Sequence, residues 1–367
     1  MTTANQVQEN IQKELADYCQ QKEYQFFVSP ESKDPNFIRT EISNLAERAI
    51  VNIYTSGKTV VQGKPTQLRK ELETLKPQLE NNSKGLPANQ TSELKACSAI
   101  YDIMIPDMRG KIKDSWAELA SNCESTNSPS PHISYRTKIS NEKSSITVTQ
   151  FNNGRLMLQG KTDYFFDSCC DNIEKIAHPS KKDVASRFVC SDQTALDAFV
   201  SKSTPDLIKL AEEETIKSLS SSFQFLDKAD QDWFVASKCL CVAEIILPEY
   251  SALVMPSSKA FEGFCKKLLV KIGLFPQNHF DSKKATFGFL SDKNHPSRKA
   301  ICAAQKHAET YLERVDLALD RYRNFMMHSD DSFVTRVETH EKALSIVKDI
   351  MKEQEELYEY FSKVFTL

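Results

Sequence analysis

Residues 136–161 read RTKISNEKSSITVTQFNNGRLMLQGK, and residues 39–64 read RTEISNLAERAIVNIYTSGKTVVQGK. When the two stretches are aligned without gaps, at an offset of 97 residues, ten of the 26 positions carry the same residue. Chance would give roughly one or two identities in such a window. The stretch is therefore an internal repeat, and the chain is expected to build the same structural unit twice.

Both copies alternate apolar and polar residues in the way that half-buried strands require. Three strands are expected in each copy: around Ile42 and Ile139, at 50–54 and 146–151, and at 59–62 and 156–159. Glycine-containing turns at 55–58 and 152–155 separate the last two strands, as a tight hairpin requires. A helix is expected next, at 66–75 and at 164–176. Three strands followed by a helix make an α+β unit.

The composition between these units is typical of linkers. Residues 81–89 are rich in Gly, Pro, Asn and Ser, and residues 124–131 read ESTNSPSP. Residues 92–123, between the linkers, are predicted to be helical. Boundaries near Asn89 and Pro179 divide the chain into segments 1–89, 90–179 and 180–367.

The C-terminal segment lacks the residues that usually end helices, because residues 289–367 contain no glycine and Pro296 is the last proline. This composition is typical of long helices. Helices are also expected at 193–200, 205–225 and 261–272, whereas the apolar run from Cys239 is read as strand-like core. Two apolar stripes recur at spacings of three and four residues: Ala308, Leu312, Val315, Leu319, Tyr322 and Met326, then Leu344, Val347, Met351, Tyr358, Phe361 and Phe365. These patterns predict a helical bundle.

A short motif follows the first stripe, where Arg323, Asn324 and His328 form the pattern Arg-Asn-x-x-x-His. Histidine titrates near neutrality and suits the removal of a proton from an RNA 2′-hydroxyl, while arginine stays charged and grips phosphate. The alternative is a helix end whose basic residues lie against its own carbonyls. On an ideal helix Arg323 and His328 point about 140° apart. They converge only if the helix ends near Met327 or if the site forms at a dimer interface.

The overall composition argues against several other functional classes of protein. The net charge of −3 and pI of about 6.2 indicate that any RNA binding comes from local patches. Lys58, Lys64, Arg155 and Lys161 could contact phosphate or merely solvate the hairpin tips. No apolar run reaches the length of a membrane span, and the N-terminus lacks the features of a signal peptide. The ten cysteines include no CxxC pair, so we expect cytosolic thiols and neither a metal site nor a cofactor.

Four features carry a resemblance to known families. The hairpin-plus-QG pattern resembles TATA-binding-protein-like (TBP-like) modules, and RNFMMH resembles the active-site motif of HEPN ribonucleases. Together with residues 146–161 and the stretch from LPEY to KAFEG at 247–263, the chain resembles the RNase LS family of bacterial toxins. The implied fold class is α+β, with two duplicated TBP-like antiparallel sheet-plus-helix modules followed by an α-helical HEPN bundle.

This resemblance implies a cytoplasmic endoribonuclease toxin of a toxin–antitoxin system, which cleaves mRNA without a metal and acts in anti-phage defence. It implies a proteinaceous antitoxin bound at the C-terminal domain, and a homodimer that completes the site. By position, His328 is the general base or acid, Arg323 stabilises phosphate charge and Asn324 orients the pair. Glu262 occupies a position where the family has a functional carboxylate, and Lys259 occupies a position where the family has a basic residue.

A purely structural role is the alternative for these positions. Lys259 and Glu262 could form a surface ion pair of little energetic value. Asp330 occupies the place of a tyrosine that is modified in HEPN proteins silenced by nucleotide transfer, so we expect direct binding by an antitoxin instead. For the chain as a whole, the rival is a non-catalytic nucleic-acid-binding or scaffold protein with a degenerate HEPN bundle.

Overall fold

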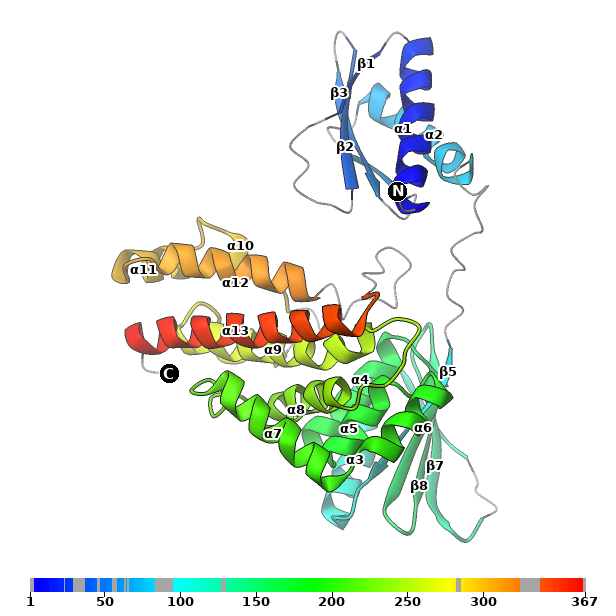
Figure 1. The fold of residues 1–367 in the computed structure, drawn as a ribbon, viewed down its shortest axis with the longest axis vertical. Helices are drawn as coiled ribbons and strands as arrows, with labels where there is room; N and C mark the ends of the chain where they lie inside the picture. Colours follow the sequence, from blue (N-terminus) through cyan, green and yellow to red (C-terminus); the bar gives the residue numbers. More distant parts are fainter. Residues whose placement is uncertain are drawn as a thin grey trace. The chain divides into compact units, whose positions relative to one another are not determined.

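The computed structural model describes residues 3–22, 24–28, 37–44, 47–54, 58–62, 64, 66–82, 95–126, 130–281, 285–323 and 337–365. These residues form an α+β fold with two antiparallel sheets in the N-terminal half and a helical C-terminal region (Figure 1). The predicted fold class is therefore confirmed. The chain divides into two compact units, one spanning Met1–Glu93 and the other beginning at Leu94.

The first unit is a four-stranded antiparallel sheet with two helices. Its elements are α1 (Thr3–Gln21), β1 (Gln25–Val28), β2 (Phe37–Ser43), β3 (Arg48–Tyr54), β4 (Thr59–Gln62) and α2 (Gln67–Asn82), and the strand order is β1-β2-β3-β4. Ile42, Val51 and Ile53 point from the sheet into a core shared with Leu15 and Leu72 of the helices. The three strands and the helix predicted for this copy are confirmed, whereas α1 and β1 were not predicted.

The second unit begins with a five-stranded antiparallel sheet. Its elements are β5 (Ala96–Asp102), α3 (Pro106–Leu119), β6 (Asn122–Ser125), β7 (Ile133–Ser140), β8 (Ser145–Phe151), β9 (Arg155–Lys161) and α4 (Tyr164–Ala177), in the strand order β5-β9-β8-β7-β6. The helix predicted over residues 92–123 is wrong at both ends, where β5 and β6 lie. Cys97, Ala99 and Tyr101 are buried on one face of β5, so the correct period there is two.

The structure extends the repeat beyond the stretch found in the sequence. Strand β6 lies 97 residues after β1, which is the offset of the repeat itself. The pairing register is also the same, because Ile42 faces Ala49 in the first sheet and Ile139 faces Ile146 in the second. Both copies therefore share the order helix, four strands, helix, and β5 is an additional strand on the edge of β9.

Two glycines in the second copy explain why the turn and the sheet–helix packing form. Gly154 has φ of 96° in the hairpin between β8 and β9, a conformation that favours glycine. A Cβ at Gly160 would lie 3.2 Å from Ile146 and 3.4 Å from Phe166, so the missing side chain lets β9 approach α4 closely. Asp163 then caps α4 by accepting a hydrogen bond from the Phe166 backbone N–H at 2.8 Å.

The rest of the second unit is helical. Its elements are α5 (Lys181–Phe188), α6 (Gln193–Lys202), α7 (Pro205–Leu219), α8 (Lys228–Val242), α9 (Ser251–Lys271), η2 (His279–Asp281), α10 (Gly288–Ser291), α11 (Pro296–Ala304), α12 (Ala308–Arg323) and α13 (His340–Val364). The strand-like interpretation of the run from Cys239 is wrong, because these residues end α8. α8 is buried on most sides and buries polar as well as apolar residues, so it shows no clear apolar stripe, which explains the error. Cys239 and Cys241 are nevertheless buried core residues, as predicted.

The two predicted apolar stripes lie in α12 and α13. Leu312, Val315 and Leu319 of α12 are buried in the same core as Val347 and Phe361 of α13. Met326 lies outside the described residues. Among the helices that the structure describes, none is both long enough and apolar enough to cross a bilayer.

Candidate active site

Two motif segments that are far apart in the sequence meet where α9 packs against α12. The Phe261 ring of α9 contacts the Tyr322 ring of α12 edge to face, with centroids 5.4 Å apart and planes at 83°. Both side chains are almost completely buried. Glu262 follows Phe261 and Arg323 follows Tyr322, so each of the two helices carries a predicted site residue next to this ring contact.

The first residue of the Arg-Asn-x-x-x-His motif lies at the C-terminal end of α12, as the apolar stripe predicts. Arg323 is the last residue of α12, and its side chain is not among those described. Asn324, His328 and Asp330 lie outside the described residues. The convergence of Arg323 and His328 therefore remains a prediction.

Glu262 lies on the side of α9 that is partly open to solvent. Its carboxylate Oε1 is 2.7 Å from the Lys266 Nζ, one helical turn further along α9, and its side chain is 17% exposed. A partly exposed pair of this kind contributes little stability. The carboxylate is therefore held in place without being sealed off from a ligand.

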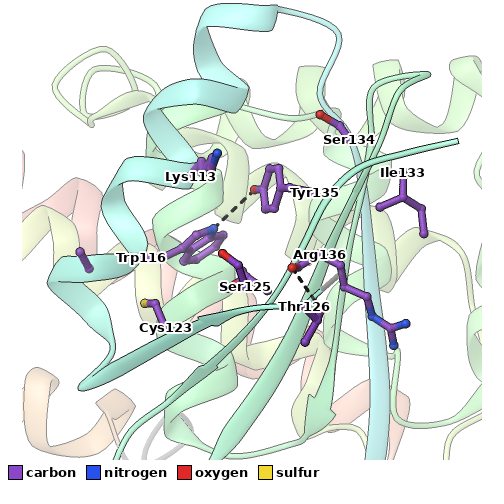
Figure 2. A pocket seen from close by; sticks show the side chains of 11 residues that line it. Lys113, Trp116, Cys123, Ser125, Thr126, Ile133, Ser134, Tyr135 and Arg136 are labelled. Carbon is purple, nitrogen blue, oxygen red and sulfur yellow. Dashed lines mark hydrogen bonds between the residues drawn. The ribbon is translucent and has the colours of Figure 1, made fainter. Parts of the chain in front are cut away.

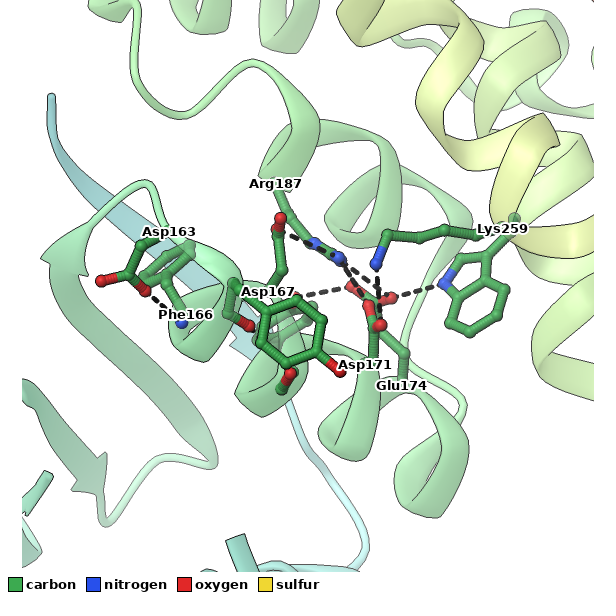
Figure 3. A network of polar contacts seen from close by, with 11 residues as sticks. Asp163, Phe166, Asp167, Asp171, Glu174, Arg187 and Lys259 are labelled. Carbon is green, nitrogen blue, oxygen red and sulfur yellow. Dashed lines mark hydrogen bonds and ion pairs between the residues drawn. The ribbon is translucent and has the colours of Figure 1, made fainter. Parts of the chain in front are cut away.

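Lys259 lies one turn earlier on α9 and points toward the sheet module (Figure 3). Its Nζ donates to Oδ2 of Asp171 on α4 at 2.8 Å, and only 12% of its side chain is exposed. Burial opposes the charged form, but the carboxylates of Asp171 and Asp167 outweigh burial and raise the pKa of Lys259. Lys259 therefore carries a charge that ties the helical region to the second sheet module.

The bond to Asp171 belongs to a larger buried network between α4, α5, α8 and β5. Arg187 of α5 donates to Asp171 at 2.6 and 3.0 Å and lies 3.5 Å from Glu174. Glu174 also accepts hydrogen bonds from the Tyr101 hydroxyl at 2.7 Å and from the Trp233 indole N–H at 2.5 Å. Burial raises the pKa of Glu174. Although burial also acts on Asp171, Lys259 and Arg187 hold its pKa below the ordinary value.

This network was missed in the sequence, although a signal was present. Asp167, Asp171 and Glu174 recur at spacings of four and three along α4, which places three carboxylates on one helical face. An acidic stripe on a helix rich in apolar residues requires buried cations. Nothing local identifies Arg187 and Lys259 as those cations, because they come from α5 and α9.

Another buried carboxyl, outside this network, lies beneath the segment that contains Glu262. Asp230 of α8 rests against the Cα of Gly263, and a Cβ at that position would overlap its carboxylate. Burial, followed by the charge of Asp227, raises the pKa of Asp230 to about 8. The sequence gives no indication of this, because the shift arises from the packing of α8 on α9.

The second sheet module also contains a cavity of about 390 Å³ between α3 and strands β6 and β7 (Figure 2). Trp116 and Tyr135 line it, and the Trp116 indole N–H donates to the Tyr135 hydroxyl at 3.5 Å. Lys113 lies 5.5 Å from the centre of the Tyr135 ring. None of the predicted site residues lines this cavity. Among the residues that the structure describes, no cluster of three or more His, Cys, Asp or Glu side chains could hold a metal ion.

Comparison with known proteins finds a matching family model and similar solved structures. Residues 209–329 match the family described as RNase LS, bacterial toxin DBD domain. A crystal structure of Escherichia coli toxin LsoA in complex with T4 phage antitoxin Dmd is 12% identical in sequence, with a TM-score of 0.37, over 72% of this chain and 99% of that one. A search of the curated proteins found no match.

The matched range begins within α7, contains α9 and α12, and extends past His328. It therefore includes all five predicted site residues. Across residues 209–329, this chain is therefore similar to the DBD domain of the RNase LS bacterial toxins.

Proposed function

We propose that this chain is an endoribonuclease toxin of a toxin–antitoxin system that cleaves mRNA without a metal ion. The family match over residues 209–329 carries this proposal. It is supported by the contact between Phe261 and Tyr322, which joins the helix of Glu262 to the helix that ends at Arg323.

In the proposed reaction, His328 takes the proton from a 2′-hydroxyl, and the 2′-oxygen attacks the adjacent phosphorus. The bond from phosphorus to the 5′-oxygen breaks, and the departing 5′-oxygen takes up a proton from water while His328 returns its proton to solvent. This leaves a 2′,3′-cyclic phosphate and a 5′-hydroxyl end. Arg323 stabilises the charge that develops on the phosphoryl oxygens, and Asn324 orients these two residues. Glu262 supplies a carboxylate beside them, and Lys259 holds α9 in position through Asp171.

The proposal also covers the roles of the domains, the oligomeric state and the cellular location of the enzyme. Segments 1–89 and 90–179 are the two TBP-like modules, and segment 180–367 is the HEPN domain that carries catalysis and binds a proteinaceous antitoxin. A homodimer brings two Arg323 and His328 sets to one cleft. The toxin acts in the cytoplasm, as part of anti-phage defence.

The test is RNA cleavage by purified wild type, His328→Ala and Arg323→Ala with excess chelator present. We expect cyclic phosphate ends from wild type, and a fall in rate of at least about 100-fold for His328→Ala. His132→Ala is the matched control, because this histidine is exposed on the second sheet module. Circular dichroism verifies that each variant folds.

Three outcomes would contradict the proposal. Equal cleavage by wild type and His328→Ala would place the active site elsewhere. If every oligomeric form of the wild-type protein binds RNA and none cleaves it, the chain is a non-catalytic binding protein. Loss of wild-type cleavage in chelator would indicate a metal-dependent reaction.

A further inference from the structure

The two sheet modules have diverged at most positions, so the residues that they still share require explanation. Folding accounts for several of them. Ile42 and Val51 are buried in the first core, and their counterparts Ile139 and Val148 are buried in the second. The Asn141 side chain accepts hydrogen bonds from the backbone of the following turn.

Three shared pairs have no such structural role. They are Arg39 and Arg136, Gln62 and Gln159, and Lys64 and Lys161. Within the part of the chain that the structure describes, none of these six side chains makes a hydrogen bond or an ion pair. Exposed positions without structural contacts ordinarily diverge between copies, so a common ligand is the simplest reason for their retention.

The register of the second sheet places its three residues on one face. Arg136 on β7 lies opposite Thr149 on β8, which lies opposite Met157 on β9. Gln159 and Lys161 follow Met157 at intervals of two and therefore share its side of the sheet. We call this the outer face, because Ile139, Val148 and Leu158 point the other way, into the core shared with α3 and α4.

The first sheet repeats this arrangement. Arg39 on β2 lies opposite Asn52 on β3, and Asn52 lies opposite Val60 on β4. Gln62 shares the face of Val60, and Lys64 follows two residues later. Gln62 and Lys64 are exposed, and Arg39 is half-buried. The outer face of the first sheet therefore carries Arg39 and Gln62, and the exposed Lys64 lies just past the end of β4.

The chemistry of these residues matches a phosphodiester chain. Arginine and lysine bind phosphate, and a glutamine amide both donates and accepts hydrogen bonds to sugars and bases. Arg136 is separated from β9 by two strand spacings, about 10 Å, so one small anion cannot contact both strands. By contrast, Lys238, Lys266 and Lys267 of the helical region are each paired with a carboxylate.

We propose that the outer face of each sheet binds the backbone of single-stranded RNA through its retained Arg, Gln and Lys. This binding goes beyond the proposed cleavage and does not depend on it. It gives the acidic chain two local basic surfaces that hold RNA.

The test measures binding of the full chain to a fluorescently labelled 2′-O-methyl RNA oligonucleotide, which cannot undergo 2′-hydroxyl attack. Arg136→Gln/Lys161→Gln alters the second sheet, and Arg39→Gln/Lys64→Gln alters the first. We expect each double variant to bind about tenfold more weakly. The slope of log affinity against log salt should fall by about 1.4 for two lost phosphate contacts.

Lys111→Gln/Lys143→Gln is the matched control. It removes two exposed charges from the second module at positions that the outer face does not include. If both outer-face variants bind RNA like this control, the proposal is wrong. If they bind RNA normally but lose self-association in sedimentation, the outer face is a protein interface instead. If a double variant fails to fold, Gln159→Ala replaces it, because this substitution leaves the net charge unchanged. It should weaken RNA binding without changing the slope of log affinity against log salt.

Discussion

Phe261 and Tyr322 lie 61 positions apart in the sequence, yet their rings meet edge to face with centroids 5.4 Å apart. This contact fixes α9 against α12 at the point where each helix carries predicted site residues. Glu262 and Arg323 are the next residues along their helices. The aromatic pair is therefore the structural support of the proposed active site.

Phe261→Ala should lower the free energy of unfolding by about 4 kcal/mol, because it leaves a cavity between α9 and α12. It should also reduce RNA cleavage by loosening the alignment of the two helices. Urea denaturation and a cleavage assay measure the two effects. Leu317→Ala is the control on α12, since Leu317 is 71% exposed and should change stability by less than about 0.5 kcal/mol. Equal stability of the two variants would contradict this role of the ring contact.

Lys259→Met should destabilise the chain by about 3 kcal/mol, because it leaves the buried Asp171 carboxylate with Arg187 as its cation. Lys266→Met removes a more exposed partner and should cost less than about 1 kcal/mol. Denaturant unfolding of both variants provides the comparison. A stable but inactive Lys259→Met protein would instead assign this lysine to catalysis.

Glu262→Gln should preserve stability within about 1 kcal/mol, since the carboxylate forms a partly exposed pair with Lys266. Cleavage should nevertheless fall at least about tenfold if the carboxylate acts on the substrate. Lys266→Gln breaks the same pair from its other side and should retain activity. Similar rates for Glu262→Gln and Lys266→Gln would exclude a functional role for the carboxylate.

Asp230→Asn should stabilise the chain relative to wild type, and the gain should grow with pH. An aspartate in the unfolded chain titrates near 3.9, whereas burial raises the pKa of Asp230 to about 8 in the folded chain. Between these values the folded state holds a proton that the unfolded state lacks, so wild-type stability falls as pH rises. The difference should increase from about pH 4 to 8 and level off above. For Asp227→Asn, the stability difference from wild type should change less with pH. A difference between Asp230→Asn and wild type that stays constant across this pH range would contradict the burial of Asp230.

Gly263→Ala should destabilise the chain by about 2 kcal/mol, because the added methyl group overlaps the Asp230 carboxylate. The double variant Asp230→Ala/Gly263→Ala removes that carboxylate and should recover most of the loss relative to Asp230→Ala alone. Thermal unfolding of the four proteins completes a double-mutant cycle. Additive effects would show that the two residues do not interact.

The repeat at 39–64 and 136–161 determined three strands of each sheet, since alternation and turn residues act within a few positions of each other. The long helices were equally predictable from apolar spacing and the absence of glycine. Helix α1 and strands β1, β5 and β6 were not, because short or weakly patterned elements are specified by the partners that they contact. The run from Cys239 gave no usable period because α8 is buried on most sides.

For the candidate site, the sequence alone supplied the Arg-Asn-x-x-x-His motif, its place at the end of a helix, and Glu262. Only the tertiary structure decided that Lys259 is held by Asp171, 88 residues away. It also decided that α9 meets α12 at Phe261, and that Asp230 lies against Gly263. The physical reason is that periodicity is encoded locally, whereas burial and charge pairing depend on which distant elements pack together.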